Sequence, residues 1–111
     1  MSSPKISRGD VWWVSLDPTQ GAEIQKTRPC VVLTNDTLNR LRKTVVVIPL
    51  STAAKPHPPI TLSVTCDHKR VVAVVDQIRA VAKHRLVNKL GTLSEADMDA
   101  LSQAAATILE L

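Results

Sequence analysis

Short apolar runs separated by turn residues fill the first half of the chain. Residues 9–16 are rich in β-branched and aromatic side chains and stop at an Asp-Pro turn signal, so they predict a first strand. Residues 29–34 and 44–50 are almost wholly apolar, which indicates strands covered on both faces. Between them, residues 35–41 offer a cap residue and leucines three apart, so we expect a short helix there.

The strand pattern continues, with interruptions, to residue 82. Residues 60–65 alternate apolar and polar side chains, and residues 70–75 and 78–82 add strand sequence on either side of a polar Asp-Gln pair. Residues 55–59 are rich in proline, which lacks the amide hydrogen that a sheet ladder needs. We therefore predict a loop over this segment.

The period of the pattern changes near the C-terminus. Ser94 can cap a helix, with Asp97 three residues further on. Leu93 can then pack against Met98, and apolar residues recur at helical spacing after it. Short strands followed by one helix, with no internal repeat, predict a single domain over residues 1–111. Its class is mainly β, a small half-open barrel with a C-terminal α-helix.

Composition narrows the class of protein. The 111 residues are 44% hydrophobic and 22% charged, which is ordinary for a globular domain. The apolar runs are much shorter than a membrane span, and the N-terminus lacks the apolar core of a secretory signal, so we expect a cytoplasmic protein with no membrane partner. Cys30 and Cys66 lie far apart in sequence, which favours reduced thiols over a disulfide.

Charge is distributed unevenly along the chain. The formal net charge is +4, but residues 95–111 hold four of the ten acids and none of the fourteen lysines and arginines, so residues 1–94 carry +8. A basic body attracts polyanions, of which nucleic acid is the commonest. Composition leaves open the alternative of a basic surface that has no specific partner.

Several kinds of chemistry find no support in the sequence. The three glycines, at positions 9, 21 and 91, cannot form a phosphate-binding loop, so no nucleotide cofactor is expected. No serine has a histidine and an aspartate placed as in known hydrolase motifs. Cys66, Asp67 and His68 are close in sequence, but no further metal ligand is near them. They predict a hairpin turn and no metal site.

Charged and hydroxyl side chains remain as candidates for chemistry. Arg28 precedes a proline, which favours extended backbone and places it at the start of a strand. Ser51 and Thr52 follow the end of another strand. Because strand ends gather at the rim of a barrel, the guanidinium could meet a hydroxyl there. From position alone, a solvated arginine and an ordinary Ser-Thr turn explain these residues at least as well.

Fragments along nearly the whole chain form a recognisable series. They read RGDVWWVSLDPT at 8–19, GAE at 21–23, TRP at 27–29, TND at 34–36, IPLS at 48–51 and DQIR at 76–79. Any one fragment would be weak evidence of kinship. In this order and at these spacings, they resemble the landmarks of the MazF/PemK/Kid family of toxin endoribonucleases.

The resemblance implies a fold, an assembly and a reaction. The fold is an SH3-like barrel of the PemK/CcdB type with short helices and a C-terminal helix, assembled as a homodimer. Single-stranded RNA would lie in a groove near the subunit interface. Sequence-specific, metal-independent cleavage of mRNA would follow from attack of the ribose 2'-hydroxyl on the adjacent phosphate, leaving a 2',3'-cyclic phosphate and a 5'-hydroxyl. A cognate antitoxin, expected to be acidic, would neutralise the toxin.

By the same resemblance, four residues are candidates for catalysis. Arg28 matches the family's catalytic arginine, and its rigid fork of donors suits phosphate oxygens. Ser51 falls where the family usually has threonine and keeps the hydroxyl. Glu23 matches an acid implicated in activity, although a plain salt bridge would also explain it. Asp76 matches an acid proposed as the base or as an orienter of the cleft.

Two departures from the family leave the acid–base assignment open. Ala22 stands where certain members carry histidine, and Val74 stands where the same members carry a second arginine. We expect contacts to RNA from the residues beside the catalytic candidates, namely Lys26, Thr27, Thr52, Gln77 and Arg79.

The two adjacent tryptophans should differ in environment. Neighbouring strand residues point to opposite faces of a sheet, so one of Trp12 and Trp13 is expected in the core. The other is free to stack on a base or to line the dimer interface, and the interface is the simpler expectation.

Two other classes of protein remain as alternatives. One is a toxin of the same fold that binds a protein, as gyrase poisons do. Those act through a tryptophan at the tip of the terminal helix, whereas this chain ends Ile-Leu-Glu-Leu. The other is an RNA-binding module without catalytic activity, for which Ser51 and Val74 give some room.

Overall fold

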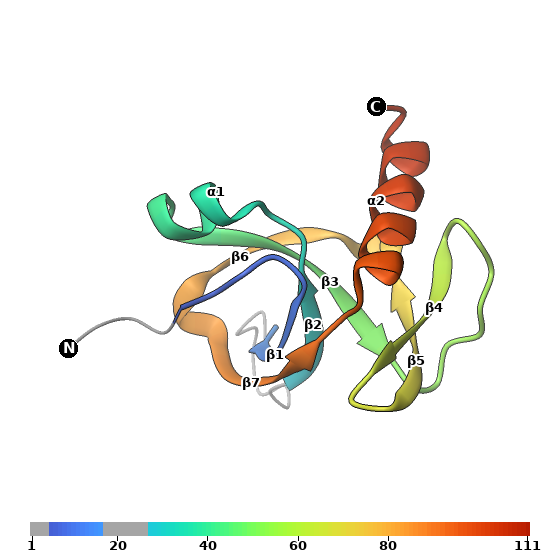
Figure 1. Ribbon diagram of the computed structural model, residues 1–111, viewed down its shortest axis with the longest axis horizontal. Coiled ribbons are helices and arrows are strands. Elements are labelled where there is room, and N and C mark those ends of the chain that lie inside the picture. The colour runs from blue at the N-terminus through green and yellow to red at the C-terminus, as the bar shows by residue number, and fades with distance from the viewer. Residues whose placement is uncertain (1–4, 17–26) are drawn as a thin grey trace, which may run out of the picture.

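One curled antiparallel sheet carries the C-terminal helix at one end (Figure 1). The computed structural model describes residues 5–16 and 27–111. Its elements are β1 (Asp10–Ser15), β2 (Thr27–Val32), α1 (Asp36–Leu41), β3 (Thr44–Ser51), β4 (Thr61–Cys66), β5 (Lys69–Val74), the 3₁₀ turn η1 (Val75–Gln77), β6 (Arg79–Ala82), the 3₁₀ turn η2 (Lys83–Arg85), β7 (Leu86–Thr92) and α2 (Glu95–Leu109).

Strand β3 is shared between two parts of the sheet. The strand order is β4-β5-β3-β2-β1-β7, and β6 pairs with β3 beside this path. The first half of β3, from Thr44 to Val47, pairs with β6, whereas Leu50 and Ser51 at its end pair with β5. The start of β3 is therefore joined to β6, and its end is joined to the β5–β4 hairpin. This division of partners curls the sheet into the predicted half-open barrel.

Both faces of the central strands are buried, as their apolar sequences predict. Along β2, the side chains of Cys30 and Val32 pack in the cluster enclosed by the curled strands, and Val31 between them packs in a second cluster. That second cluster also holds Ile48 and Leu50 of β3. Because successive side chains of a strand alternate between faces, unbroken apolar runs satisfy both cores at once.

Helix α2 covers the second cluster. Its predicted start is confirmed: the Ser94 hydroxyl accepts a hydrogen bond of 3.1 Å from the amide of Asp97. Met98 and Leu101 are buried against the sheet. Figure 1 shows the C-terminal turns of the helix extending beyond the sheet. The short predicted helix is also present as α1, capped by the Asn35 side chain, which accepts from the amide of Leu38 at 2.9 Å.

The predicted hairpin turn between β4 and β5 is present. Asp67 and His68 both have positive φ angles, 53° and 65°, as a tight two-residue hairpin turn requires. Cys66 is buried, and both it and Cys30 are free thiols, as predicted. In the described ranges, no helix is long and apolar enough to cross a membrane.

Strand β7 was not predicted. Its sequence LVNKLGT buries only Leu86 well, so the alternation that marks a half-buried strand is missing. The strand forms because β1 supplies its partner, with two register shifts along the ladder. Asp10 strengthens this edge: its buried carboxylate lies 3.3 Å from the Lys89 ammonium and accepts from the amide of Ser7 at 2.9 Å.

Candidate active site

An open hollow lies where β2 begins and β3 ends. Its volume is about 430 Å³. The residues that line it come from four strands and the segment after β3: Trp13, Thr27, Arg28, Pro29, Leu50, Ser51, Thr52, Ala53 and Val71. Four of the predicted site residues, Thr27, Arg28, Ser51 and Thr52, are thus brought together although up to 25 positions separate them in sequence.

Arg28 is the cation of the hollow. It sits near the start of β2, opposite Val14 of β1, with its side chain exposed. Among the described residues it forms no ion pair. An exposed guanidinium on a strand has a fixed base and free donors, so it can present two parallel N–H groups to a phosphate.

Ser51 supplies the hydroxyl of the hollow. Its Oγ accepts hydrogen bonds from the amides of Ala53 and Ala54, each 3.1 Å long. A hydroxyl that accepts two hydrogen bonds still has its own proton to donate. These amides therefore fix the oxygen in place and leave its O–H available for an anion in the hollow.

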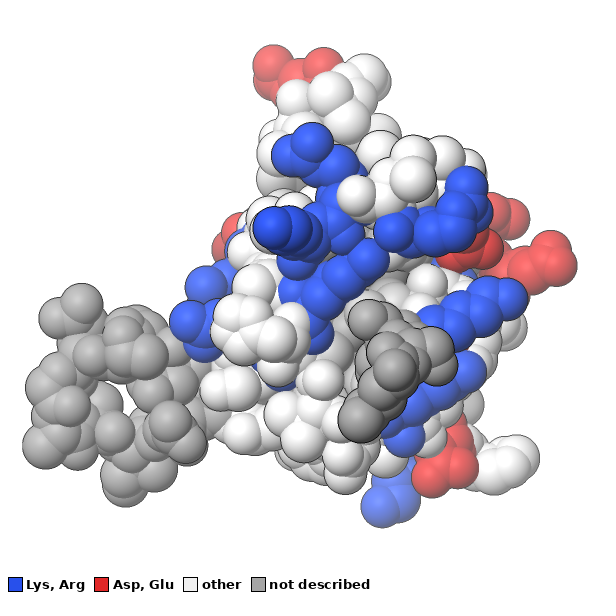
Figure 2. Space-filling view, turned by 90° about the vertical axis from the view of Figure 1, so that its left-hand side faces the viewer, with Lys and Arg blue, Asp and Glu red and all other residues white. Residues whose placement is uncertain are grey.

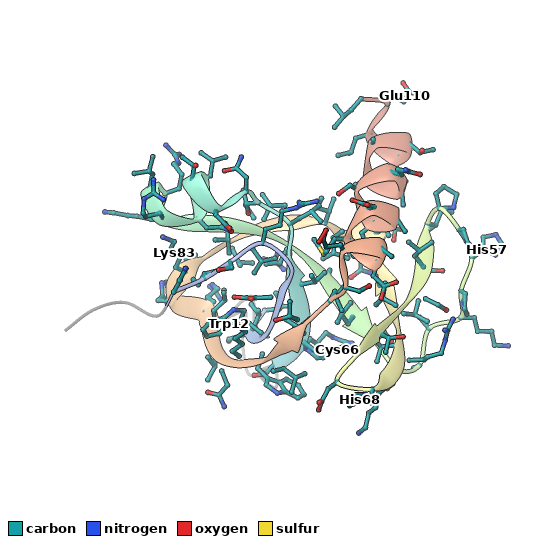
Figure 3. All side chains as sticks on the ribbon, in the orientation of Figure 1. Trp12, His57, Cys66, His68, Lys83 and Glu110 are labelled. Carbon is teal, nitrogen blue, oxygen red and sulfur yellow. The ribbon has the colours of Figure 1, made fainter. Side chains whose placement is uncertain are left out.

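Trp13 forms one wall of the hollow, and Trp12 lies in the core. Trp12 is 5% exposed, and its indole N–H donates to the Asp10 carboxylate at 3.4 Å. Figure 3 places it inside the curl of the strands. Trp13 is 36% exposed and faces the hollow. The predicted division between the two side chains is confirmed, and the exposed one stands beside the candidate catalytic groups.

The buried Cys30 thiol lies near two arginines, Arg28 and Arg79. Burial raises the pKa of its thiol to about 12, while the nearby charges of Arg79 and Arg28 act in the opposite direction. Both guanidinium groups are therefore close enough to be felt at this one sulfur. Burial outweighs them, so the thiol stays neutral and unreactive.

The remaining predicted site residues lie elsewhere. Asp76 and Gln77 are exposed in η1, and Arg79 begins β6 opposite Val47; none of the three lines the hollow. Glu23 and Lys26 lie outside the described residues. The hydroxyls of Thr27, Ser51 and Thr52 and the Arg28 guanidinium are thus the predicted groups that the described part of the chain gathers in one place.

Other landmark residues hold the scaffold together. The amide of Arg8 donates to the Asp36 carboxylate at 2.7 Å, and its guanidinium donates to the Leu33 carbonyl and, at 2.6 Å, to the Ser102 hydroxyl. Thr34 accepts from the amide of Val46 at 2.7 Å. The RGD and TND fragments are therefore anchors that join the N-terminal segment, α1 and α2.

Fold and hollow together define a small half-open β-barrel with a cationic cleft at its rim. The model of the PemK-like, MazF-like toxins of type II toxin-antitoxin systems matches residues 7–109. The chain therefore belongs to this family, as its sequence fragments predicted.

Two relatives that are named endoribonucleases support membership of this family. Endoribonuclease MazF9 of Mycobacterium tuberculosis (strain ATCC 25618 / H37Rv) is 38% identical, over 96% of this chain and 98% of its own. Endoribonuclease EndoA of Bacillus subtilis (strain 168) is 33% identical, over 96% of each chain.

Solved structures agree on the fold. A mycobacterial endoribonuclease in complex with its cognate antitoxin superposes with a TM-score of 0.78 at 25% identity, covering 98% of this chain and 97% of its own. A MazE-MazF structure from Deinococcus radiodurans gives a TM-score of 0.85 at 18% identity, covering 98% and 99%. At that identity the second likeness bears on the fold alone.

Proposed function

We propose that this protein is an endoribonuclease toxin that cleaves single-stranded mRNA at a specific sequence without a metal ion. The observation that carries the proposal is the hollow in which Arg28 and the Ser51 hydroxyl line the same space. Relatives named endoribonucleases support the same activity. The +8 charge of residues 1–94 favours a polyanionic substrate, and an mRNA substrate places the work in the cytoplasm.

The reaction makes and breaks one bond at phosphorus. The ribose 2'-oxygen loses its proton to a base and forms a bond to the adjacent phosphorus. The bond from phosphorus to the 5'-oxygen then breaks, and that oxygen takes a proton from an acid. The products are a 2',3'-cyclic phosphate and a 5'-hydroxyl, and no electron is gained or lost.

Arg28 and Ser51 act on the charge that grows at the phosphate oxygens. The guanidinium offers a rigid fork of donors to phosphate oxygens, so its role is electrostatic. The Ser51 hydroxyl donates to a second oxygen from its fixed position. Thr27 and Thr52 offer further donors at the edge of the hollow. Fixed donors of this kind can each be worth about a hundredfold or more in rate.

The two acids among the candidates have positioning roles in the proposal. We propose that Glu23 positions Arg28 or the 2'-hydroxyl, and that Asp76 orients the cleft from η1. Gln77, Arg79 and Lys26 complete the RNA contacts. A Glu23→Gln variant should lower the rate and remove the acidic limb of its pH profile; an unchanged profile would leave Glu23 with a structural role.

The direct test is cleavage of a mixed-sequence RNA by the purified protein in the presence of a chelator. We expect fragments that end in cyclic phosphate and begin with a 5'-hydroxyl. Arg28→Ala should abolish them, Arg28→Lys should retain little activity, and Arg70→Ala, which removes an exposed cation of β5, should cleave normally. Full cleavage by Arg28→Ala would show that the site is misplaced, and RNA binding without cleavage would favour the silent module.

We also infer that the protein forms a homodimer and binds an acidic antitoxin. Exposed apolar side chains such as Ile60 and Leu109 offer surface for a subunit contact. Light scattering should then give about twice the 12.1 kDa mass of the chain. A mass equal to one chain across the working concentrations would contradict the dimer.

A further inference from the structure

A second basic surface lies away from the hollow, at the end of the barrel that carries α1. It is formed at two places along the chain: Arg40 in the last turn of α1 with Arg42 and Lys43 after it, and Lys83 and Arg85 in η2 between β6 and β7. We call these five residues the α1–η2 surface. Figure 2 faces this side of the molecule and shows lysine and arginine over much of it, with acidic side chains at the margins.

The two places are joined through the backbone. The amide of Lys83 donates to the carbonyl of Lys43 at 2.9 Å, and Thr44 pairs with Ala82 in the ladder that follows. Two cationic segments far apart in sequence therefore share one end of the barrel, where Figure 3 labels Lys83. The ladder between β3 and β6 therefore fixes the backbone from which these cationic side chains extend.

Four of the five cations have no acidic partner within the described part of the chain. Arg40, Arg42 and Lys43 are exposed, and Lys83 is half-buried. None of these four forms an ion pair with a described residue. The nearest acid in sequence, Asp36, already accepts from the amide of Arg8 at 2.7 Å. Like charges gathered without acids repel one another, so an anionic ligand that binds here would relieve this repulsion.

The α1–η2 surface connects with the hollow through Arg85. The Arg85 guanidinium donates to the carbonyl of Ser15 at 3.1 Å, and Ser15 pairs with Thr27, the residue before Arg28. A second link runs along β6, because this strand begins at Arg79, whose charge acts on Cys30 together with that of Arg28, and ends at Ala82, next to Lys83. Positive charge thus continues from the hollow to the α1–η2 surface along the barrel.

We propose that the α1–η2 surface binds the phosphates of RNA on one side of the cleaved bond, outside the hollow. The inference rests on the proposed function, since it takes the hollow as the place where the bond is cut. RNA is favoured because a polynucleotide carries a phosphate at every residue and can span both places.

The surface has a defined effect on affinity. Phosphate contacts outside the hollow tighten the binding of long RNA and leave the reaction at the bond unchanged. Removing three of them should lower the slope of log affinity against log salt by about 2, since each contact to a single strand contributes about 0.7. The affinity for long RNA should then fall about a hundredfold more at 0.1 M salt than at 1 M salt.

The experiment compares two RNAs and two charge-matched variants. The short RNA is the shortest one that the wild type cleaves, and the long RNA is the same sequence extended at both ends. For binding, both carry a 2'-deoxy sugar at the attacked position, which removes the nucleophile. One variant is Arg42→Gln/Lys43→Gln/Lys83→Gln. The other, Lys55→Gln/Lys69→Gln/Arg70→Gln, removes three exposed cations elsewhere and controls for net charge.

The wild type and the control should bind the long RNA more tightly than the short one. The first variant should lose most of that difference and about 2 of the salt slope, while it cleaves the short RNA at the wild-type rate. Equal losses in both variants, or none in the first, would overturn the proposal. If the first variant instead lost only affinity for polyglutamate, the surface would be a protein site.

Failure of the proposed function would look different. In that case the wild type would cleave no RNA, while the binding of a long unmodified RNA and its loss in the first variant would still be measurable. Circular dichroism of both variants checks that the fold is kept. The first variant changes Arg42 and Lys43 between α1 and β3 and Lys83 at the start of η2, and the control changes exposed side chains, so we expect unchanged spectra.

Discussion

The role of the Ser51 hydroxyl, whose oxygen accepts from two backbone amides, can be tested by substitution. Ser51→Ala removes both the donor to phosphate and the acceptor for Ala53 and Ala54. We expect the cleavage rate to fall by about 10²–10³. Ser51→Thr keeps the hydroxyl and should stay within a few-fold of the wild type.

Single-turnover cleavage rates measure this difference, with melting temperature as the check on folding. Thr52→Ala is the comparison variant, because it removes the neighbouring hydroxyl at the edge of the hollow, and it should cost less rate than Ser51→Ala. If Ser51→Ala kept the wild-type rate while Thr52→Ala lost it, the catalytic hydroxyl would belong to Thr52.

Trp13 makes a second separable contribution, to binding rather than to rate. Its half-exposed ring faces the hollow, where a base next to the cleaved phosphate could stack on it. Trp13→Ala should weaken RNA binding by about 1–3 kcal/mol, and Trp13→Phe should recover most of that loss. Fluorescence anisotropy with a non-cleavable RNA gives the dissociation constants. Equal affinity of Trp13→Ala and the wild type would assign Trp13 to a subunit contact instead.

At the scale of residues, the candidate reacting groups could be predicted from the sequence, whereas their surroundings could not. Arg28 and Ser51 were found through short fragments whose order resembles the family, and both line the hollow. Local pattern could not show that Asp10 would be a buried carboxylate, because its partner Lys89 lies on the neighbouring strand β7, far along the chain. Nor could it tell which of Trp12 and Trp13 would be buried, since the ladder between β1 and β7 shifts register on each side of this pair, after Val11 and before Val14.

At the scale of elements, strands with strong alternation or continuous apolar character were predicted, and strand β7 was not. Six of its seven residues are not buried, so the signal that identifies a strand from sequence is absent. The partner strand β1 decides its structure through long-range pairing, which a local pattern does not contain.

The β4–β5 turn offers a test of an element's local chemistry. His68 has a φ of 65°, a conformation that costs a residue with a Cβ about 1 kcal/mol or more and costs glycine nothing. We expect His68→Gly to raise the free energy of unfolding by about 0.5–1 kcal/mol, after the greater freedom of glycine in the unfolded chain is subtracted. Urea denaturation measures it.

The matched control for the turn is His57→Gly. His57 lies in the exposed segment before β4, and its φ is not among the positive ones. That substitution should leave stability unchanged or lower it slightly. A loss of stability in His68→Gly would mean that the histidine side chain contributes more than the backbone strain costs.

At the scale of the whole molecule, the division of charge was readable from the sequence and its arrangement was not. Counting residues gives the basic body of +8, but the meeting of the α1–β3 turn with η2 follows from the ladder between β3 and β6. The same holds for the hollow, which needs the ends of β2 and β3 side by side. Topology thus converts an overall excess of cations into two distinct basic places.

The charge of the whole body also sets how an antitoxin should bind. If the proposed partner is an acidic chain that orders on contact, long-range attraction speeds its association, and salt screens that attraction over about 10 Å at 0.1 M. We expect the association rate with the cognate antitoxin to fall at least tenfold between low salt and 0.5 M, with a much smaller change in the dissociation rate. Surface plasmon resonance separates the two rates, and an association rate that is independent of salt would show that apolar contacts dominate the encounter.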